Sequence, residues 1–320
     1  MTLIQTLFHL TNFKSPLLAT LVPSVSAAYA IQTACALPSI ALQSEHFYDL
    51  SGSLTYLAVT ALSLSLPTLR ARAAGGLATP LIPSILGAFR SGSGGASPLN
   101  WRQVVLSGAV GLWAARLGTY LFTRVRAQGS DSRFDEIKKS PLRFWGAFMM
   151  QATWVSLCVM PVVAVNAVPA AAFAGAGLKL TDVLGLGMFA GGLVFEVLAD
   201  GQKSKWLREK RERKHDEEFM TGGLFGVCRH PNYFGESMLW TGIATAAAGV
   251  VLAQPARAAL GISPAAALAM CYVSPAFVTF LLLKVSGVPL SEKKYDARYG
   301  GRKEYQEWKK NTPRFFPKLF

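Results

Sequence analysis

Long apolar runs separated by short polar segments are the feature that most restricts how this chain can fold. Each run approaches or exceeds the roughly 20 residues that an α-helix needs to cross the hydrocarbon core of a bilayer. The runs cover residues 16–42, 51–69, 101–122, 144–168, 180–199, 233–253 and 258–285. The sequence therefore predicts an all-α fold, a polytopic integral-membrane helical bundle with about seven transmembrane helices.

The composition also favours a bilayer over water. Of the 320 residues, 51% are hydrophobic and only 16% are charged, against roughly 25% charged residues in an average soluble domain. A chain with so few charged side chains has too little polar surface to cover a water-exposed globule.

Two connections and one span have unusual local sequences. Residues 77–89 are apolar but too few for a span, and we expect them to be interfacial or re-entrant. Residues 92–98 (GSGGASP) have the composition of a flexible loop. The last apolar run contains Pro264 and Pro275, which predict a kink or a break into two helices.

The formal net charge of +14 comes from Lys and Arg residues that cluster outside the apolar runs, mainly in 202–213 and 293–318. Loops rich in Lys and Arg usually face the cytoplasm and attract anionic lipid. Because membrane-length runs separate these stretches, the charge indicates membrane lipid as a partner and no nucleic acid.

The cysteines do not indicate a disulfide framework or a metal site. Cys35, Cys158, Cys228 and Cys271 are scattered and form no C-x-x-C pair. The first 14 residues also lack the basic-then-apolar pattern of a signal peptide, so we expect the first apolar run to be retained as a span.

The sharpest local motif is the octet that runs from Arg229 to Glu236, RHPNYFGE. Pro231 suits the first turn of a helix, because it lacks the N–H that this turn leaves unused. The free N–H groups and positive dipole end of such a helix start favour a phosphate, and Arg229 adds a planar fork of donors. Asn232 and Glu236 share one helix face. The alternative is an ordinary helix start with a basic flank and a satisfied glutamate.

The octet resembles the signature of the steroid 5-alpha-reductase C-terminal domain family, especially its large branch of membrane proteins. The segments WAARLGTYLFTR (113–124), DSRFD (131–135), FEVLADGQK (195–203) and the ending 292–317 are also similar to that family. The resemblance covers roughly 101–320 and is weaker around 45–56. It implies a domain division into an N-terminal transmembrane region, 1–100, on the possible lipid-substrate side, and a cofactor-binding domain, 101–320.

The resemblance further implies a membrane enzyme, by default of the endoplasmic reticulum, that uses NADPH to reduce an activated carbon–carbon double bond in a lipophilic small molecule. Arg116 lies within a span and needs an anionic partner, which a cofactor phosphate would provide. Glu196 and Asp200 would accept ribose or amide groups, although a structural salt-bridge network is as plausible. The residues expected to contact NADPH are Arg116, Tyr120, Arg124, Arg133, Glu196, Asp200, Lys203, Arg229, His230, Asn232, Tyr233, Glu236 and Tyr295.

The proton donor is less clearly marked. Steroid reductases have a tyrosine about one turn before the counterpart of Arg116, and Trp113 stands there in this chain, with an N–H but no phenol. The catalytic candidates are therefore His46 or Tyr48 as donor, with Asp49 orienting one of them. A polar span boundary without catalytic role is the alternative for each.

Two other functions fit parts of the sequence. Membrane isoprenylcysteine carboxyl methyltransferases share the Arg-His-Pro…Tyr…Gly pattern and a basic tail, and they hold S-adenosylmethionine. The segments 116–133 and 195–203 resemble the reductase branch more closely. A lipid-binding protein that keeps a relic of the cofactor pocket is the third possibility, and Trp113 gives it some weight.

Overall fold

The computed structural model describes residues 11–73, 84–90, 99–128 and 131–318. Regular structure in these residues is helical, without a strand. Six helices in the described part of the chain are long and apolar enough to cross a membrane, or seven if one bent helix pair counts as a span. The chain is a multi-pass helical membrane protein, which confirms the predicted fold class.

The bent pair and the last span correct the predicted boundaries. The predicted span 233–253 is α9 (Pro231–Val251), which turns by 85° into α10 (Gln254–Leu260). Gly261, at φ 68°, ends α10 in the left-handed conformation that glycine favours. The next helix, α11 (Pro264–Phe280), begins at Pro264. Pro264 therefore starts a helix, as proline does in a first turn, and the predicted span 258–285 is broken before it.

Other predicted segments are only partly described. Within the predicted interfacial segment 77–89, residues 77–83 lie outside the described residues, and α4 (Ile85–Arg90) follows them. The predicted loop 92–98 also lies outside them.

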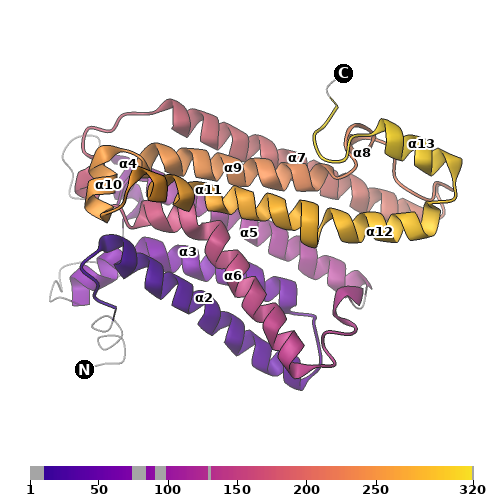
Figure 1. The fold of residues 1–320 in the computed structure, drawn as a ribbon, viewed down its shortest axis with the longest axis horizontal. Helices are drawn as coiled ribbons and strands as arrows, with labels where there is room; N and C mark the ends of the chain where they lie inside the picture. The colour runs from indigo at the N-terminus through magenta and orange to yellow at the C-terminus, as the bar shows by residue number, and fades with distance from the viewer. Residues whose placement is uncertain (1–10, 74–83, 91–98, 129–130, 319–320) are drawn as a thin grey trace. The chain divides into compact units, whose positions relative to one another are not determined.

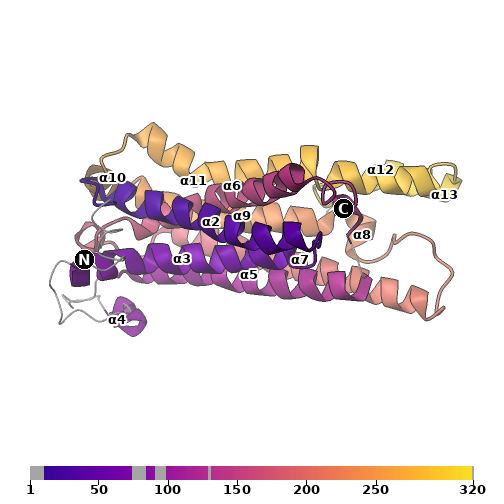
Figure 2. The same cartoon turned by 90° about the horizontal axis from the view of Figure 1, so that it is seen from below.

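The described helices form two compact units. The first unit comprises residues 1–179 and 247–273, so the domain boundary predicted at residue 100 falls inside it. Its elements include α2 (Pro16–Ala41), α3 (Tyr48–Ala73), α5 (Trp101–Gln128), η1 (Ser132–Phe134), α6 (Pro141–Asn166) and η2 (Ala170–Phe173), besides α4 and α10. Helix α2 packs against α3 and α6, and α3 also packs against α5 (Figures 1 and 2).

Side-chain hydrogen bonds join the helices of the first unit. Gln32 Nε2 donates to Thr55 Oγ1 at 2.8 Å, which links α2 to α3. Gln151 Nε2 donates to Ser51 Oγ at 3.1 Å, which links α6 to α3. Lipid tails are as apolar as leucine, so close packing and hydrogen bonds of this kind hold membrane helices together.

The second unit comprises residues 180–246 and 274–320. It contains α7 (Leu180–Arg211), α8 (Leu224–Val227), α9 as far as residue 246, the π-helix η3 (Leu281–Val285), α12 (Val288–Tyr299) and α13 (Lys303–Asn311). Helices α7 and α9 run side by side (Figure 1). A Cβ atom on Gly192 would lie 2.6 Å from the carbonyl oxygen of Gly235, so the two backbones touch at this crossing.

Candidate functional site: a pocket at the start of α9

A pocket that is partly open to solvent lies in the second unit, where α9 begins. Its walls come from the end of α7, the segment 220–233, α12 and α13. The lining residues are Lys203, Trp206, Leu207, Met220, Phe225, Arg229, His230, Asn232, Tyr233, Ser291, Glu292, Tyr295, Tyr305 and Trp308.

The segment after α13 holds the residues that precede α9. The backbone N–H of Arg229 donates to the carbonyl of Pro313 at 2.9 Å, and that of Lys318 donates to Val227 at 2.9 Å. The Cys228 thiol donates to the carbonyl of Phe315 at 3.0 Å. These bonds position the Arg229 backbone directly before the first turn of α9.

Arg229 and Glu292 form the closest ion pair in the pocket wall. Arg229 Nη1 lies 2.6 Å from Glu292 Oε1, and the two side chains are 12% and 21% exposed. The Nε of Arg229 is buried and has no hydrogen-bond acceptor among the described residues.

His230 is a buried, neutral member of the same wall. Its ring stacks on Tyr233 with centroids 5.5 Å apart, and its Nε2 lies 3.4 Å from Glu292 Oε1. Burial lowers the pKa of His230 to about 4, against the opposing effect of its hydrogen bond with Glu292. At neutral pH the imidazole therefore carries no charge.

Acidification should destabilise the protein through His230. In the unfolded chain the pKa returns to about 6.5, so between about pH 6.5 and pH 4 the unfolded state binds a proton that the folded state does not. Stability is lost as the pH falls through this window, by up to about 3 kcal/mol. Thermal unfolding of the wild type and of His230→Gln at pH 7.5 and at pH 4.5 measures this effect. Wild type should lose more than the variant on acidification, and an equal loss would contradict the assignment.

Aromatic side chains form most of the remaining wall, and neighbouring groups fix several of them. Trp206 Nε1 donates to Glu217 Oε2 at 2.9 Å, and Trp308 Nε1 donates to the carbonyl of Phe225 at 3.1 Å. The Tyr305 hydroxyl donates to Asp296 Oδ1 at 2.7 Å. Burial and this hydrogen bond raise the pKa of Tyr305. Flat rings beside cations suit a ligand that combines an aromatic base with a phosphate.

The structure brings some of the predicted cofactor residues together in this pocket. They are Lys203, Arg229, His230, Asn232, Tyr233 and Tyr295. Sequence reasoning missed Glu292, although Glu292 and Tyr295 are three residues apart and share one face of α12. It also missed the aromatic wall that Trp206, Tyr305 and Trp308 provide.

Three predicted carboxylates of the second unit lie elsewhere. Glu196 and Asp200 are buried on α7, and Glu236 is half-buried on α9. Among the described residues that line the pocket, none of these three is included. Their predicted contact with a cofactor stays a prediction.

The predicted catalytic residues belong to the first unit, where Asp49 contacts two arginines. Its Oδ2 lies 3.4 Å from Arg133 Nη2 and 3.8 Å from Arg124 Nη2, so it pairs with guanidinium groups; its predicted role in orienting His46 or Tyr48 stays a prediction. The Tyr48 hydroxyl donates to the carbonyl of Ala147 at 2.9 Å, and His46 is exposed. The predicted roles of Arg124 and Arg133 toward a cofactor remain untested.

Arg116 and Trp113 lie on α5 in the same unit. The Arg116 guanidinium lies 5.4 Å from the centre of the Tyr120 ring. Trp113 is buried and meets Tyr56 edge to face, with ring centroids 5.1 Å apart. Trp113 thus packs in an aromatic cluster that contains a phenol, although its own side chain has none.

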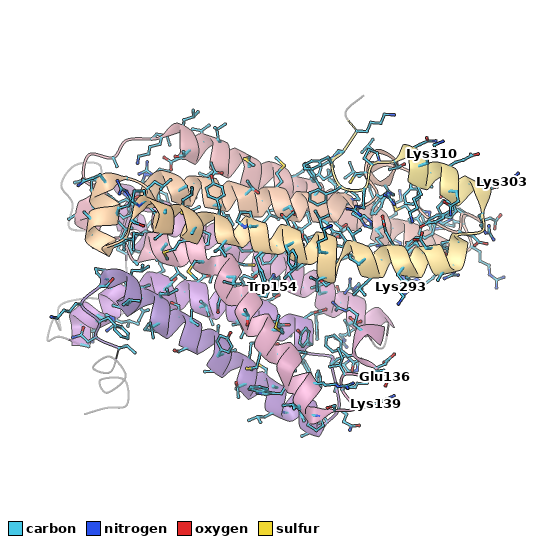
Figure 3. The ribbon with its side chains drawn as sticks, viewed as in Figure 1. Glu136, Lys139, Trp154, Lys293, Lys303 and Lys310 are labelled. Atoms are coloured by element: carbon cyan, nitrogen blue, oxygen red, sulfur yellow. The ribbon has the colours of Figure 1, made fainter. Side chains whose placement is uncertain are left out.

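The basic tail is mostly a surface feature. Lys293, Lys303 and Lys310 are exposed on α12 and α13 (Figure 3). Lys309 pairs with Asp296, with Nζ 2.6 Å from Oδ1. These lysines do not line the pocket.

Fold and pocket together define a multi-pass helical membrane protein with a cationic, aromatic-walled site at the start of one helix. The chain belongs to the family described as protein of unknown function (DUF1295), whose model matches residues 77–312. This family is associated with steroid 5-alpha-reductase-like membrane proteins. No curated protein and no solved structure matches the chain.

Proposed function

We propose that this protein is a membrane-embedded, NADPH-dependent reductase that acts on an activated carbon–carbon double bond of a lipophilic substrate, with the endoplasmic reticulum as its membrane. The observation that carries the proposal is the pocket at the start of α9. Lys203, Arg229 and Asn232 supply cationic and amide donors there, beside several aromatic faces. The resemblance of the chain to steroid 5-alpha-reductase C-terminal domains supports the same cofactor.

The residues of the pocket fit a nicotinamide dinucleotide. Arg229 lines the pocket with a side chain that is 12% exposed, and its guanidinium suits a phosphate oxygen as acceptor. Trp206, Tyr233 and Tyr295 offer rings for stacking. Glu292 offers a carboxylate that accepts hydrogen bonds from hydroxyl groups.

When bound, NADPH would supply a hydride, and the protein would supply position and electrostatics. Lys203 and Arg229 would offset the phosphate charge. Apolar membrane helices would admit the substrate from the bilayer and keep water from the reacting carbon. His46 or Tyr48 remains the proposed proton donor, with Asp49 orienting one of them. Tyr48 would have to leave its bond to Ala147 in order to donate to a substrate carbonyl.

A methyltransferase that uses S-adenosylmethionine is the second candidate, because one observation favours it. The pocket carries aromatic faces of Trp206, Tyr233, Tyr295, Tyr305 and Trp308. Such faces attract a cation such as the sulfonium group. The reductase stays the first choice, because the segments 116–133 and 195–203 resemble that branch more closely.

Thermal shift of the purified chain separates the candidates. NADPH should raise the Tm, because a ligand at 100 times its Kd stabilises a folded protein by about 2.7 kcal/mol. NADPH oxidation should then appear with members of a panel of enones and enals. Asn232→Ala should reduce both the thermal shift and the oxidation of NADPH, because it removes an amide from the pocket. Glu236→Ala tests whether the carboxylate one turn further along α9 contributes to cofactor binding, as the sequence predicts.

The other outcomes are equally definite. A shift with S-adenosylmethionine alone would replace the reductase by a methyltransferase. Binding of NADPH without turnover across the whole panel would favour a non-catalytic lipid-binding protein.

A further inference from the structure

Glu292 carries the single negative charge among the described residues that line the pocket. One of its oxygens, Oε1, takes both contacts with its neighbours: Arg229 Nη1 at 2.6 Å and His230 Nε2 at 3.4 Å. Its other oxygen, Oε2, has no hydrogen-bond donor among the described residues. An ion pair that serves only to hold Arg229 needs no more than the first oxygen.

Glu292 lines the pocket, and its side chain is 21% exposed. Its second oxygen is not among the buried side-chain atoms that lack a partner. A ligand in the pocket that donates hydrogen bonds can therefore reach this carboxylate.

We infer that Glu292 binds the two neighbouring hydroxyls of an unsubstituted ribose by accepting hydrogen bonds from them. Its negative charge would exclude a phosphate from that position. An ionised carboxylate only accepts hydrogen bonds, so its ligand must present donors, as a vicinal diol does. A phosphate on the same ribose would remove a donor and place like charges together.

The inference rests on the proposed function only in taking the pocket as a nucleotide site. NADPH has one ribose with free hydroxyls, on its nicotinamide side, because its adenine ribose carries the extra phosphate. Glu292 would therefore face the nicotinamide ribose of NADPH, or the single ribose of S-adenosylmethionine.

Calorimetric titration of the full chain in detergent tests this reading, with nicotinamide mononucleotide and its 2′,3′-dideoxy analogue as probes. Wild type should bind the ribose form about tenfold more tightly than the dideoxy form, as expected for hydrogen bonds to a charged group. Glu292→Gln should lose about this tenfold for the ribose form and leave the dideoxy form unchanged. Glu304→Gln, the same change at an exposed position of α13, is the matched control and should keep the preference.

Equal weakening of both probes in Glu292→Gln would overturn the inference, since the carboxylate would then merely hold Arg229. Absence of a hydroxyl preference in wild type, or of binding by either probe, would also overturn it. If Glu292→Gln fails to fold, the double variant Arg229→Gln/Glu292→Gln removes both charges together, and it too should lose the preference. NADPH oxidation tests the proposed reductase separately. The protein could fail to oxidise NADPH and still prefer the probe with hydroxyls, or it could oxidise NADPH without showing that preference.

Discussion

Replacing Gly235 with alanine is expected to lower the Tm of the detergent-solubilised protein by roughly 2–8 °C, since overpacking of a tight contact costs about 1–3 kcal/mol. A Cβ on Gly235 would lie 2.7 Å from both the Glu196 nitrogen and the Gly192 oxygen. Both are backbone atoms, so no side chain can rotate away. Helices α7 and α9 would have to separate, with loss of their close contact.

Gly187→Ala is the matched control for this prediction. Gly187 lies on α7, and a Cβ there would meet nothing within 4 Å. Alanine is also the better helix former by about 1 kcal/mol, so this variant should equal or exceed the wild-type Tm. Equal Tm values for Gly235→Ala and Gly187→Ala would show that the crossing tolerates a side chain.

Replacing Arg229 with glutamine is expected to weaken NADPH binding by about 10- to 100-fold, the effect of losing hydrogen bonds worth about 1.5–3 kcal/mol to a charged group. Arg229 lines the pocket, and its backbone is fixed by a hydrogen bond to Pro313. Arg229→Lys should recover little, because lysine lacks the planar fork. Titration calorimetry with NADPH measures the change.

Two controls accompany this variant. Arg298→Gln removes the same charge from an exposed position of α12 and should bind NADPH like wild type. Arg229→Gln also leaves Glu292 without its ion-pair partner, so the Tm of the variant must be measured beside its affinity. Unchanged NADPH affinity in a folded Arg229→Gln protein would exclude the guanidinium from the cofactor site.

The membrane fold could be predicted from sequence because bilayer thickness fixes the length of each apolar run. The ends of the helices could not. Helix α7 continues through charged residues as far as Arg211, twelve residues beyond the predicted end, because a helix leaving the bilayer loses its apolar pattern without losing its backbone hydrogen bonds. Pro264 was also ambiguous, since proline can break a helix or begin one.

The sequence could predict the pocket residues that lie next to one another along the chain. It could not predict those that come from distant segments. The octet indicated Arg229, His230, Asn232 and Tyr233, which all line the pocket. Glu292 comes from a helix some 60 positions later, and its pairing with Arg229 depends on tertiary packing that spacing along the chain does not encode. The partners of Asp49 were missed for the same reason.

The return of the segment 313–318 along the residues before α9 sets the order in which the site can be built. Domains emerge from the ribosome with their N-terminal parts first, so the membrane helices are inserted before this segment exists. Pro313, Phe315 and Lys318 supply the bonds that fix residues 227–229. Assembly of the pocket is therefore a late event of biosynthesis, and a nascent chain halted before residue 313 would hold its spans without a finished binding site.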